Sequence, residues 1–473
     1  MNRLNELVQL LGQAYVLTGA EAQPYLVDWR GRYSGRALAV VRPGSTEQVA
    51  SVVKWCVANK VPMVPQGGNT GLCGGATPDD SGSALVVSLN RLNQIRSIDT
   101  DNDTMVVEAG CILQAVQQAA RDAQRLFPLS LAAEGSCTIG GNLATNAGGT
   151  QVLRYGNTRE LVLGIEVVTA EGEIWHGLRG LRKDNTGYDL RNLYMGSEGT
   201  LGIITAATLK LYPMPVAQCT ALLGLNSVAD AVALLSMARN GFGPALTGFE
   251  LIAGNCLHGV VQCYPEQRIP FDGESAQLPW YALLELSDSE SAGHARERFE
   301  AIVGDALEAG LVVDAVIAEN IAQSKALWHL RESIPLSEKA FGKNIKHDVS
   351  IPVSKMAEFV QTTNAALQAH WPGVEHIVFG HLGDGNLHYN VAKGTAYEEA
   401  QLLEQQKAVY QLVHDSVHRF GGSISAEHGV GQLKRDALPQ YKDPVEMALM
   451  RRIKEALDPH GLMNPGKVLS AQT

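Results

Sequence analysis

The sequence has a deficit of positive charge and no long apolar segment. Its 38 lysines and arginines face 49 aspartates and glutamates, which gives a net charge of −11. No basic stripe offsets this deficit, so nucleic acid is excluded as the main partner. No run approaches the roughly 20 apolar residues that cross a bilayer, and MNRLNELVQLLG at the N-terminus lacks a signal-peptide core. We expect a cytoplasmic protein with no transmembrane segment, whose membrane contact, if any, is peripheral.

Several cofactor signatures are also missing. The seven cysteines are an odd number, scattered and without a CxxC pair, which is typical of a reducing compartment and excludes the common iron–sulfur patterns. No GxGxxG stands between a strand and a helix, and GxxxxGK[ST] is absent. The sequence therefore supports neither a nicotinamide-binding Rossmann site nor a P-loop.

Glycine, by contrast, is abundant and clustered. Many of the 48 glycines concentrate in PQGGNTGLCGG (65–75), EGSCTIGGNLATNAGG (134–149) and GSEGTLGII (196–204), each next to a short β-rich run. Glycine at this density lets backbone N–H groups approach a bound anion closely, as a pyrophosphate cradle requires. One cluster alone would indicate tight turns, but three in one domain favour the cradle.

At 473 residues the chain predicts two or three domains. After Pro213 and Pro215, amphipathic helical patterns alternate with β-rich runs to about residue 420, as in a separate α+β domain. The last fifty residues return to glycine-containing loops and one helical pattern over 445–458.

Metal-ligand side chains gather in HLGDGNLHYN (381–390). Asp384-Gly385 between apolar runs is a strong two-residue hairpin signal. With these residues at the centre of the turn, His381 pairs with His388, and their Cβ atoms lie roughly 4.5–5.5 Å apart on one face. Asn390 falls on that face too.

Glu427, in AEHGVG (426–431), is the candidate third ligand, and the neighbouring His428 could remain metal-free and act as a base. On their own these residues form a weak pattern, equally compatible with a cross-strand histidine pair and a polar loop. A metallohydrolase would use the same three ligands, but it would be colourless and would leave the glycine clusters unexplained.

Taken in order, the motifs resemble a known family. They are PQGGNTGLCGG, EGSCTIGGNLATNAGGT, RYGNTRELVLGIEVVTAEGE, RKDNTGYDL, GSEGTLGIIT, GHLGDGNLHYN, SAEHGVG and NPGK. Together they span nearly the whole chain and resemble the FAD-linked 2-hydroxyacid dehydrogenases of the vanillyl-alcohol-oxidase type. Within that family the pattern is most similar to the D-2-hydroxyglutarate dehydrogenases, with D-lactate and glycolate dehydrogenases as relatives.

The resemblance implies an α+β fold: a two-subdomain FAD-binding domain of the vanillyl-alcohol-oxidase/PCMH type, with an antiparallel-sheet cap. Residues 1–215 would form the FAD-binding domain, 216–420 the substrate-binding cap, and 421–473 a segment that returns to the flavin domain and completes the active site. The first glycine loop contains no histidine, so noncovalent FAD is expected. The implied cofactor residues are Pro65, Gly67, Gly68, Asn69, Thr70 and Gly71 at the pyrophosphate, Gly135, Ser136, Gly140, Asn142, Gly148, Gly199 and Ile203 along the rest, and Asn464 near the ring.

For the chemistry, the resemblance implies that His381, His388 and Glu427 hold Zn²⁺, or Mn²⁺ or Co²⁺ instead. The metal would bind the substrate hydroxyl and a carboxylate oxygen and lower the hydroxyl pKa. His428 would accept the hydroxyl proton while the Cα hydrogen leaves as hydride to the flavin N5.

Three cap residues complete the implied substrate site. Arg331, in LWHLRESIP, and Lys346, in NIKHDVS, match positions that clamp substrate carboxylates, and Asn390 is a further substrate contact. One position departs from the pattern: a threonine is expected four residues after the arginine, and here it is Pro335, which has no hydroxyl.

The sequence therefore predicts oxidation of a D-2-hydroxyacid to the 2-oxoacid, with conversion of D-2-hydroxyglutarate to 2-oxoglutarate as the first choice. D-lactate, D-malate and glycolate remain alternatives because of Pro335. A flavin subunit that only relays electrons within an assembly is a further alternative. The expected electron acceptor is an external carrier, an electron-transferring flavoprotein or a quinone, and the oligomeric state stays open, with a homodimer as one option.

Overall fold

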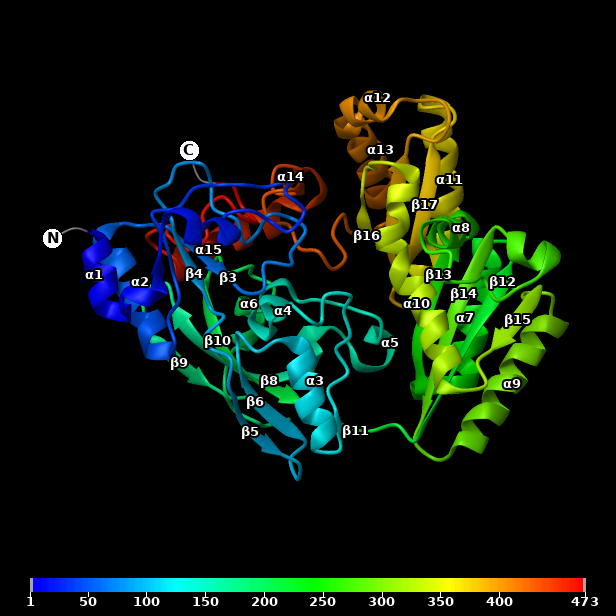
Figure 1. Cartoon of the computed structure of the whole chain (residues 1–473), viewed down its shortest axis with the longest axis horizontal. Coiled ribbons are helices and arrows are strands. Elements are labelled where there is room, and N and C mark those ends of the chain that lie inside the picture. The colour runs from blue at the N-terminus through cyan, green and yellow to red at the C-terminus, as the bar shows by residue number, and fades with distance from the viewer. Residues whose placement is uncertain (1–2, 471–473) are drawn as a thin grey trace. The chain divides into compact units, whose positions relative to one another are not determined.

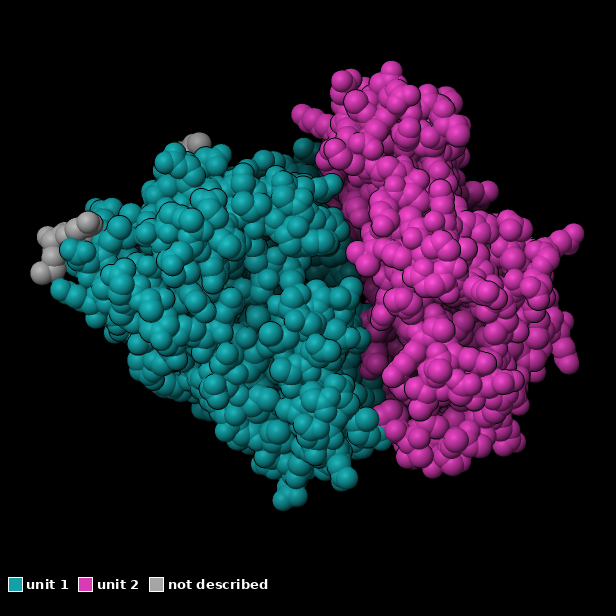
Figure 2. All heavy atoms as spheres, in the orientation of Figure 1, with its two compact units in different colours: residues 1–149, 155–214, 427–473 teal, residues 150–154, 215–426 magenta. Residues whose placement is uncertain are grey.

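The computed structural model describes residues 3–470 and divides the chain into two compact units (Figures 1 and 2). The first unit comprises residues 1–149, 155–214 and 427–473, and the second comprises 150–154 and 215–426. The second unit thus begins within a residue of the start expected for the cap and ends somewhat beyond residue 420. The assignment of 150–154 to the second unit has no counterpart in the sequence prediction.

The first unit begins with a four-stranded sheet in the order β1-β2-β4-β3. Its strands are β1 (Val16–Leu17), β2 (Ala39–Val41), β3 (Met63–Gln66) and β4 (Leu85–Ser88), with β2 and β3 parallel to β4. Helix α2 (Thr46–Asn59) buries its valines in the same core as these strands. It begins where the Ser45 hydroxyl accepts a hydrogen bond from the Gln48 N–H, and it ends at Lys60, which takes a left-handed conformation.

A five-stranded antiparallel sheet completes the first unit, in the order β5-β6-β10-β8-β9. The strands are β5 (Ile95–Asp99), β6 (Thr104–Glu108), β8 (Val162–Thr169), β9 (Ile174–Gly177) and β10 (Gly202–Lys210). Helices α3 (Leu113–Asp122) and α4 (Ile139–Thr145) bury apolar side chains in the core of this sheet. The returning C-terminal segment contributes α15 (Pro444–Leu457), with Ile453 and Leu457 packed against that core.

The second unit is built on a seven-stranded antiparallel sheet in the order β15-β12-β14-β13-β17-β18-β16. Its strands are β12 (Ala217–Leu225), β13 (Leu246–Ala253), β14 (Trp280–Asp288), β15 (Asp314–Ile317), β16 (Asp348–Ser350), β17 (Glu375–Gly380) and β18 (Asn386–Ala392). Its longer helices are α7 (Val228–Phe242), α8 (Gly254–Cys263), α9 (Ala292–Glu308), α10 (Ile321–Ser337), α11 (Met356–His370) and α13 (Gln406–Arg419).

Two of these elements bear on function. Helix α10 starts at the Asn320 cap and carries both Arg331 and Pro335, the latter in its last turn. Strand β16 is three residues long and lies at the edge of the sheet, antiparallel to β18. None of the helices in the described part of the chain has the length and hydropathy of a membrane span.

The hairpin between β17 and β18 differs from the predicted register. Phe379, and not His381, lies opposite His388, so the pairing is shifted by two residues. The cause is a turn of 3-10 helix over Leu382–Asp384: the His381 carbonyl accepts hydrogen bonds from the N–H groups of Gly385 and Asn386, both at 3.1 Å. Gly385 does take the left-handed conformation that the Asp-Gly signal predicts (φ 86°).

Candidate active site

A pocket in the first unit is lined by all three glycine clusters. It encloses about 960 Å³ of empty space, part of it open to solvent. His428 is also among the lining residues. The clusters expected to approach a phosphate-containing ligand therefore share one cavity.

The first two glycine loops approach each other too closely to accommodate side chains. A Cβ added at Gly67 would lie 2.4 Å from the Thr138 hydroxyl, and one at Gly68 would lie 2.1 Å from the Ser136 carbonyl oxygen. Both distances are far below contact distance; at Gly68 the close atom belongs to the backbone, so that position requires glycine, whereas at Gly67 the Thr138 side chain would have to move. The backbone of both loops therefore forms part of the pocket wall, which is the arrangement that an anion cradle uses.

The pocket also contains polar atoms that a ligand could satisfy. Within residues 3–470, the Thr138 hydroxyl is buried without a hydrogen-bond partner, although Thr138 lines the cavity. Buried polar groups are normally paired, so such an atom indicates a bound molecule. A large ligand with phosphate and hydroxyl groups, as FAD is, fits this combination of donors and shape.

Most of the predicted cofactor residues line this pocket. Those that do are Pro65, Gly67, Gly68, Asn69, Thr70, Gly71, Gly140, Asn142, Gly199 and Ile203. Gly135, Ser136, Gly148 and Asn464 lie outside the lining. Asn464 instead lies behind the wall, where its side-chain amide donates to the carbonyls of Gly75 (2.9 Å) and Glu198 (2.8 Å) and ties the C-terminal segment to two glycine clusters.

Glu198, which the sequence reasoning did not select, positions the loop after His428. Its carboxylate accepts hydrogen bonds from the backbone N–H groups of Val430 (2.7 Å) and Gly431 (2.8 Å). Burial raises the pKa of Glu198 in spite of these bonds. Its position within GSEGTLG was the available signal, because an acidic residue among glycines and apolar residues needs buried donors.

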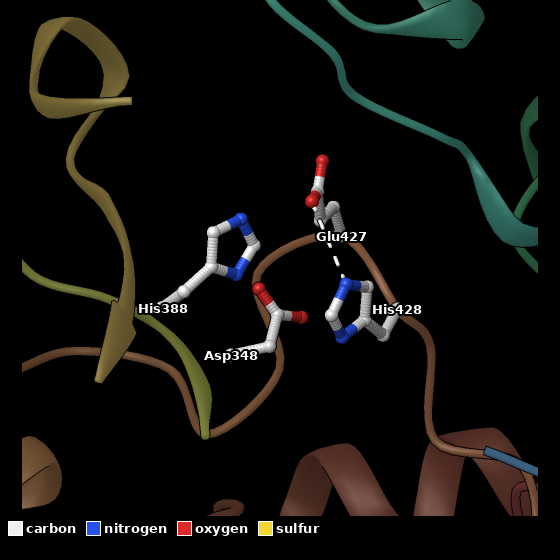
Figure 3. Close-up of side chains that lie close together, drawn as sticks. All are labelled: Asp348, His388, Glu427 and His428. Carbon is white, nitrogen blue, oxygen red and sulfur yellow. Dashed lines mark ion pairs between the residues drawn. The ribbon is translucent and has the colours of Figure 1, made fainter. Parts of the chain in front are cut away.

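A second group of candidate site residues lies near the start of β18. Asp348, His388, Glu427 and His428 each offer a ligand atom, and these atoms all lie within 4.8 Å of one another (Figure 3). Asp348 lies directly opposite His388 in the β16–β18 pairing. The Ala426 N–H donates to the Asp348 carbonyl at 3.3 Å, and Glu427 and His428 follow directly along the chain.

The donor set fits a divalent transition metal. Two imidazoles and two carboxylates are ligands that Zn²⁺, Mn²⁺, Co²⁺ and Fe²⁺ accept, and the two negative charges would be neutralised by a dication. Two of the three predicted ligands, His388 and Glu427, belong to this group. No sequence pattern indicated Asp348, which lies 40 residues before His388 and reaches it through an edge strand of three residues.

His381, the remaining predicted ligand, lies beside the group. Its ring centroid is 5.9 Å from that of His388, and its Nδ1 donates to the Glu250 carboxylate at 2.6 Å. Metal-bound histidines commonly donate their second ring N–H to a carboxylate, which fixes the tautomer. With the proton on Nδ1, Nε2 is the nitrogen whose lone pair could bind a metal.

Arg331 shares the same carboxylate. Its Nε donates to the second oxygen of Glu250 at 2.7 Å, and its guanidinium lies 5.1 Å from the centre of the Phe379 ring. Burial favours the neutral form of Glu250, but the charges of His381 and Arg331 and the hydrogen bonds from both lower the pKa of Glu250 to about 2. The guanidinium is therefore paired with a carboxylate that is ionised at neutral pH.

Lys346 and Asn390 have a similar buried carboxylate between them. Lys346 Nζ lies 2.6 Å from one oxygen of Glu338, and the Asn390 amide donates to the other at 3.0 Å. The Asn390 side-chain oxygen accepts a hydrogen bond from the backbone N–H of His347 at 3.0 Å. Lys346 remains partly exposed, with 27% of its side-chain surface accessible, whereas Asn390 is buried.

Comparison with known proteins gives consistent results. Residues 37–177 match the family model of an FAD binding domain, and residues 214–468 match that of the C-terminal domain of FAD linked oxidases. The chain is 41% identical over 450 residues to a D-2-hydroxyglutarate dehydrogenase of Xanthomonas citri pv. viticola, covering 95% of this chain and 93% of that protein. It is 39% identical over 457 residues to the mitochondrial D-2-hydroxyglutarate dehydrogenase of Bos taurus, covering 95% and 80%.

Solved structures support the same fold. A p-cresol methylhydroxylase superposes with a TM-score of 0.76 at 18% identity, covering 99% of this chain and 96% of that one. An alkyldihydroxyacetonephosphate synthase superposes with a TM-score of 0.73 at 17% identity, covering 98% and 84%. The predicted fold class, a PCMH-type FAD-binding fold with an antiparallel-sheet cap, is confirmed.

Proposed function

The chain belongs to the family of FAD-linked oxidases that includes the D-2-hydroxyglutarate dehydrogenases, and from this premise we propose that it oxidises D-2-hydroxyglutarate to 2-oxoglutarate. The observation that carries the proposal is the near full-length similarity to proteins of that name, at 41% identity for the relative from Xanthomonas citri pv. viticola. FAD binding follows from the matched domain.

The cations of the second unit suit a dicarboxylate. In a chain with a net charge of −11, an anionic substrate must be bound by local positive groups. Arg331 and Lys346 are two such groups, and each is held by a buried glutamate. An arginine can bind a carboxylate through two parallel hydrogen bonds, whereas a lysine acts as a point charge. We assign them to the two carboxylates of the substrate, with Asn390 positioning Lys346 through Glu338.

The first unit supplies the base. His428 lines the cofactor pocket, and its Nε2 lies 3.6 Å from a Glu427 oxygen. We propose that His428 accepts the proton of the substrate hydroxyl as the carbonyl forms and the Cα hydrogen leaves with its electron pair. FAD, when bound, accepts that hydride, and a divalent metal, when bound, stabilises the alkoxide. Orientation and proton transfer are then the tasks of the protein side chains.

The metal is part of the proposal. His381, His388 and Glu427 are proposed as ligands, with Zn²⁺, Mn²⁺ or Co²⁺ as the ion. Support comes from His388 and Glu427, whose ligand atoms lie within 4.8 Å of each other in the cluster that also holds Asp348 and His428, and from the carboxylate that orients His381. Asp348 is a fourth candidate, although its side chain also accepts a hydrogen bond from the Asn386 amide at 3.0 Å.

The proposal also covers the attachment of FAD, the electron acceptor and the cellular compartment. The FAD is noncovalently bound, since the first glycine loop has no histidine. Electrons leave to an external carrier, an electron-transferring flavoprotein or a quinone. The seven cysteines are free thiols in the structure, which supports a reducing compartment such as the cytoplasm.

The test is reduction of the purified protein by substrate under anaerobic conditions. The readout is the bleaching of its visible flavin spectrum. D-2-hydroxyglutarate, D-malate, D-lactate, glycolate and the L-enantiomers are compared before and after chelation. Fast bleaching by D-2-hydroxyglutarate that chelation suppresses supports the proposal. Faster bleaching by D-lactate or glycolate would establish a monocarboxylate substrate, which Pro335 favours because it offers no hydroxyl to a distal carboxylate. Coloured protein reduced by none of the acids would overturn the proposed function.

A further inference from the structure

One buried carboxylate contacts residues assigned to two different tasks. Glu250 lies in the middle of β13 and is 1% exposed. Its Oε1 accepts from His381 Nδ1 at 2.6 Å, and its Oε2 accepts from Arg331 Nε at 2.7 Å. The two donors come from the turn after β17 and from helix α10. Both oxygens are therefore used, each by a different functional side chain.

A neighbouring carboxylate shows that this arrangement is not a general property of the sheet. Glu285 lies on β14, the strand paired with β13, and is also buried. Among residues 3–470 its hydrogen-bond donors are all neutral: the Trp328 indole at 2.6 Å and the hydroxyls of Thr220 and Thr247 at 3.3 and 3.2 Å. Burial raises the pKa of Glu285. The same residue type in the same sheet thus accepts hydrogen bonds from neutral side chains at 285, and from the His381 ring and the Arg331 guanidinium at 250.

We propose that Glu250 is a positioning residue that sets the metal-binding tautomer of His381 and the orientation of the Arg331 guanidinium at the same time. This inference rests on the proposed function, since it takes His381 as a metal ligand and Arg331 as a carboxylate ligand. A proton held on Nδ1 directs the Nε2 lone pair to the ion. A carboxylate on Nε leaves the terminal nitrogens as the donors with which Arg331 binds substrate.

Geometry explains why no neutral residue can replace Glu250. Both partners are donors, so the residue between them must accept on both of its terminal atoms, and only an ionised carboxylate does so. Glutamine has the same shape, but its NH₂ group would face either the His381 N–H or the Arg331 N–H. One of the two partners would lose its hydrogen bond and turn away. The metal and substrate contacts should therefore weaken together.

The test compares Glu250→Gln with the matched control Glu285→Gln in the full chain. Each protein is stripped of metal and titrated with Zn²⁺ against a chromophoric chelator, and KM and kcat for D-2-hydroxyglutarate are measured after reloading. FAD content and thermal unfolding report folding. We expect Glu250→Gln to bind Zn²⁺ about 10- to 100-fold more weakly, in the range of lost carboxylate partners of metal-bound histidines, with KM raised about tenfold. Glu285→Gln should stay within about twofold of wild type in both.

Wild-type Zn²⁺ affinity in a folded, yellow Glu250→Gln protein would overturn the inference. An equal loss of Zn²⁺ affinity in Glu285→Gln would also overturn the inference, because any buried carboxylate of this sheet would then have the same effect. If Glu250→Gln does not fold, Glu250→Asp retains the charge but is one methylene too short to hold both donors; wild-type affinity and KM there would overturn the proposal too. Wild-type protein that binds Zn²⁺ without oxidising any hydroxyacid would refute the proposed function alone, since the titration still decides the role of Glu250.

Discussion

The candidate sites of the two units differ in composition: one consists mainly of backbone, the other of charged side chains. The pocket of the first unit is formed largely by glycine-rich backbone and small side chains, and its shape depends on loops that leave no room for a Cβ. The candidate site residues of the second unit are charged side chains in ion pairs: Arg331 with Glu250, which is buried, and Lys346 with Glu338, in which the lysine is partly exposed. Under the proposed function, the shape of the main chain would recognise a large cofactor, and the charge of side chains would recognise a small anion.

The difference predicts opposite sensitivities. In the first unit, an added methyl group should be more harmful than an altered charge, because the loops are already in contact. In the second unit, a change of charge should be more harmful than a small change of volume. Removing one member of a buried ion pair leaves the other uncompensated, at a cost of about 3–5 kcal/mol. Four substitutions test this contrast.

The largest effect is expected from Gly68→Val. Its side chain would meet the Ser136 carbonyl oxygen, 2.1 Å from the position of the Cβ, and would separate the first two glycine loops. We expect purification without FAD and loss of all activity, measured by the visible spectrum. Gly135→Ala is the control. Gly135 does not line the pocket, and the atom nearest to an added Cβ would be 3.5 Å away, which is ordinary contact distance. A yellow Gly68→Val protein with normal activity would show that the backbone contact is dispensable.

The second largest effect is expected from His381→Ala, which should abolish activity without affecting FAD binding. Activity should fall at least about 100-fold, because a ligand and the orientation that Glu250 gives it are both lost, while FAD stays bound in the other unit. The measurements are the ratio of flavin to protein, the Zn²⁺ content and the rate of flavin reduction. Loss of FAD together with the fold would show instead that His381 is structural.

Arg331→Lys should have a smaller, more selective effect. The lysine keeps a positive charge near Glu250 and so avoids the stability cost that Arg331→Ala would incur, but it loses the planar pair of donors. We expect KM for D-2-hydroxyglutarate to rise about tenfold with FAD retained, while KM for D-lactate changes less. Steady-state kinetics with both acids check this. An equal change in KM for both acids would show that Arg331 does not contact the distal carboxylate.

The contrast between the units also explains what could be predicted from the sequence. Glycine clusters report backbone geometry directly, so ten predicted cofactor residues do line one pocket. The hairpin register was wrong because a 3-10 turn at Leu382–Asp384 adds residues that the Asp-Gly signal cannot reveal. His381 and His388 nevertheless lie close together, with ring centroids 5.9 Å apart.

The carboxylates that pair with functional side chains could not be predicted in this way. Asp348 meets His388 only through the pairing of an edge strand, and Glu250 meets His381 and Arg331 through contacts between distant parts of the chain. The one local signal for Glu250 was its place in the otherwise uncharged strand LTGFELIA. A carboxylate there requires buried cationic or polar partners, but nothing local indicates which ones.

The smallest effect is expected from Pro335→Thr, which tests whether the second unit can gain a polar contact without a change of charge. Position 335 lies one helical turn after Arg331, on the same face of α10. A hydroxyl there would add one hydrogen bond to a distal carboxylate, worth about 0.5–1.5 kcal/mol, so KM for D-2-hydroxyglutarate should fall between about twofold and tenfold. Pro335→Val has the same shape without the hydroxyl and controls for the removal of proline. Equal kinetics in the two variants would mean that Arg331 and Lys346 bind the dicarboxylate without help from this turn of α10, and that Pro335 carries no information about substrate choice.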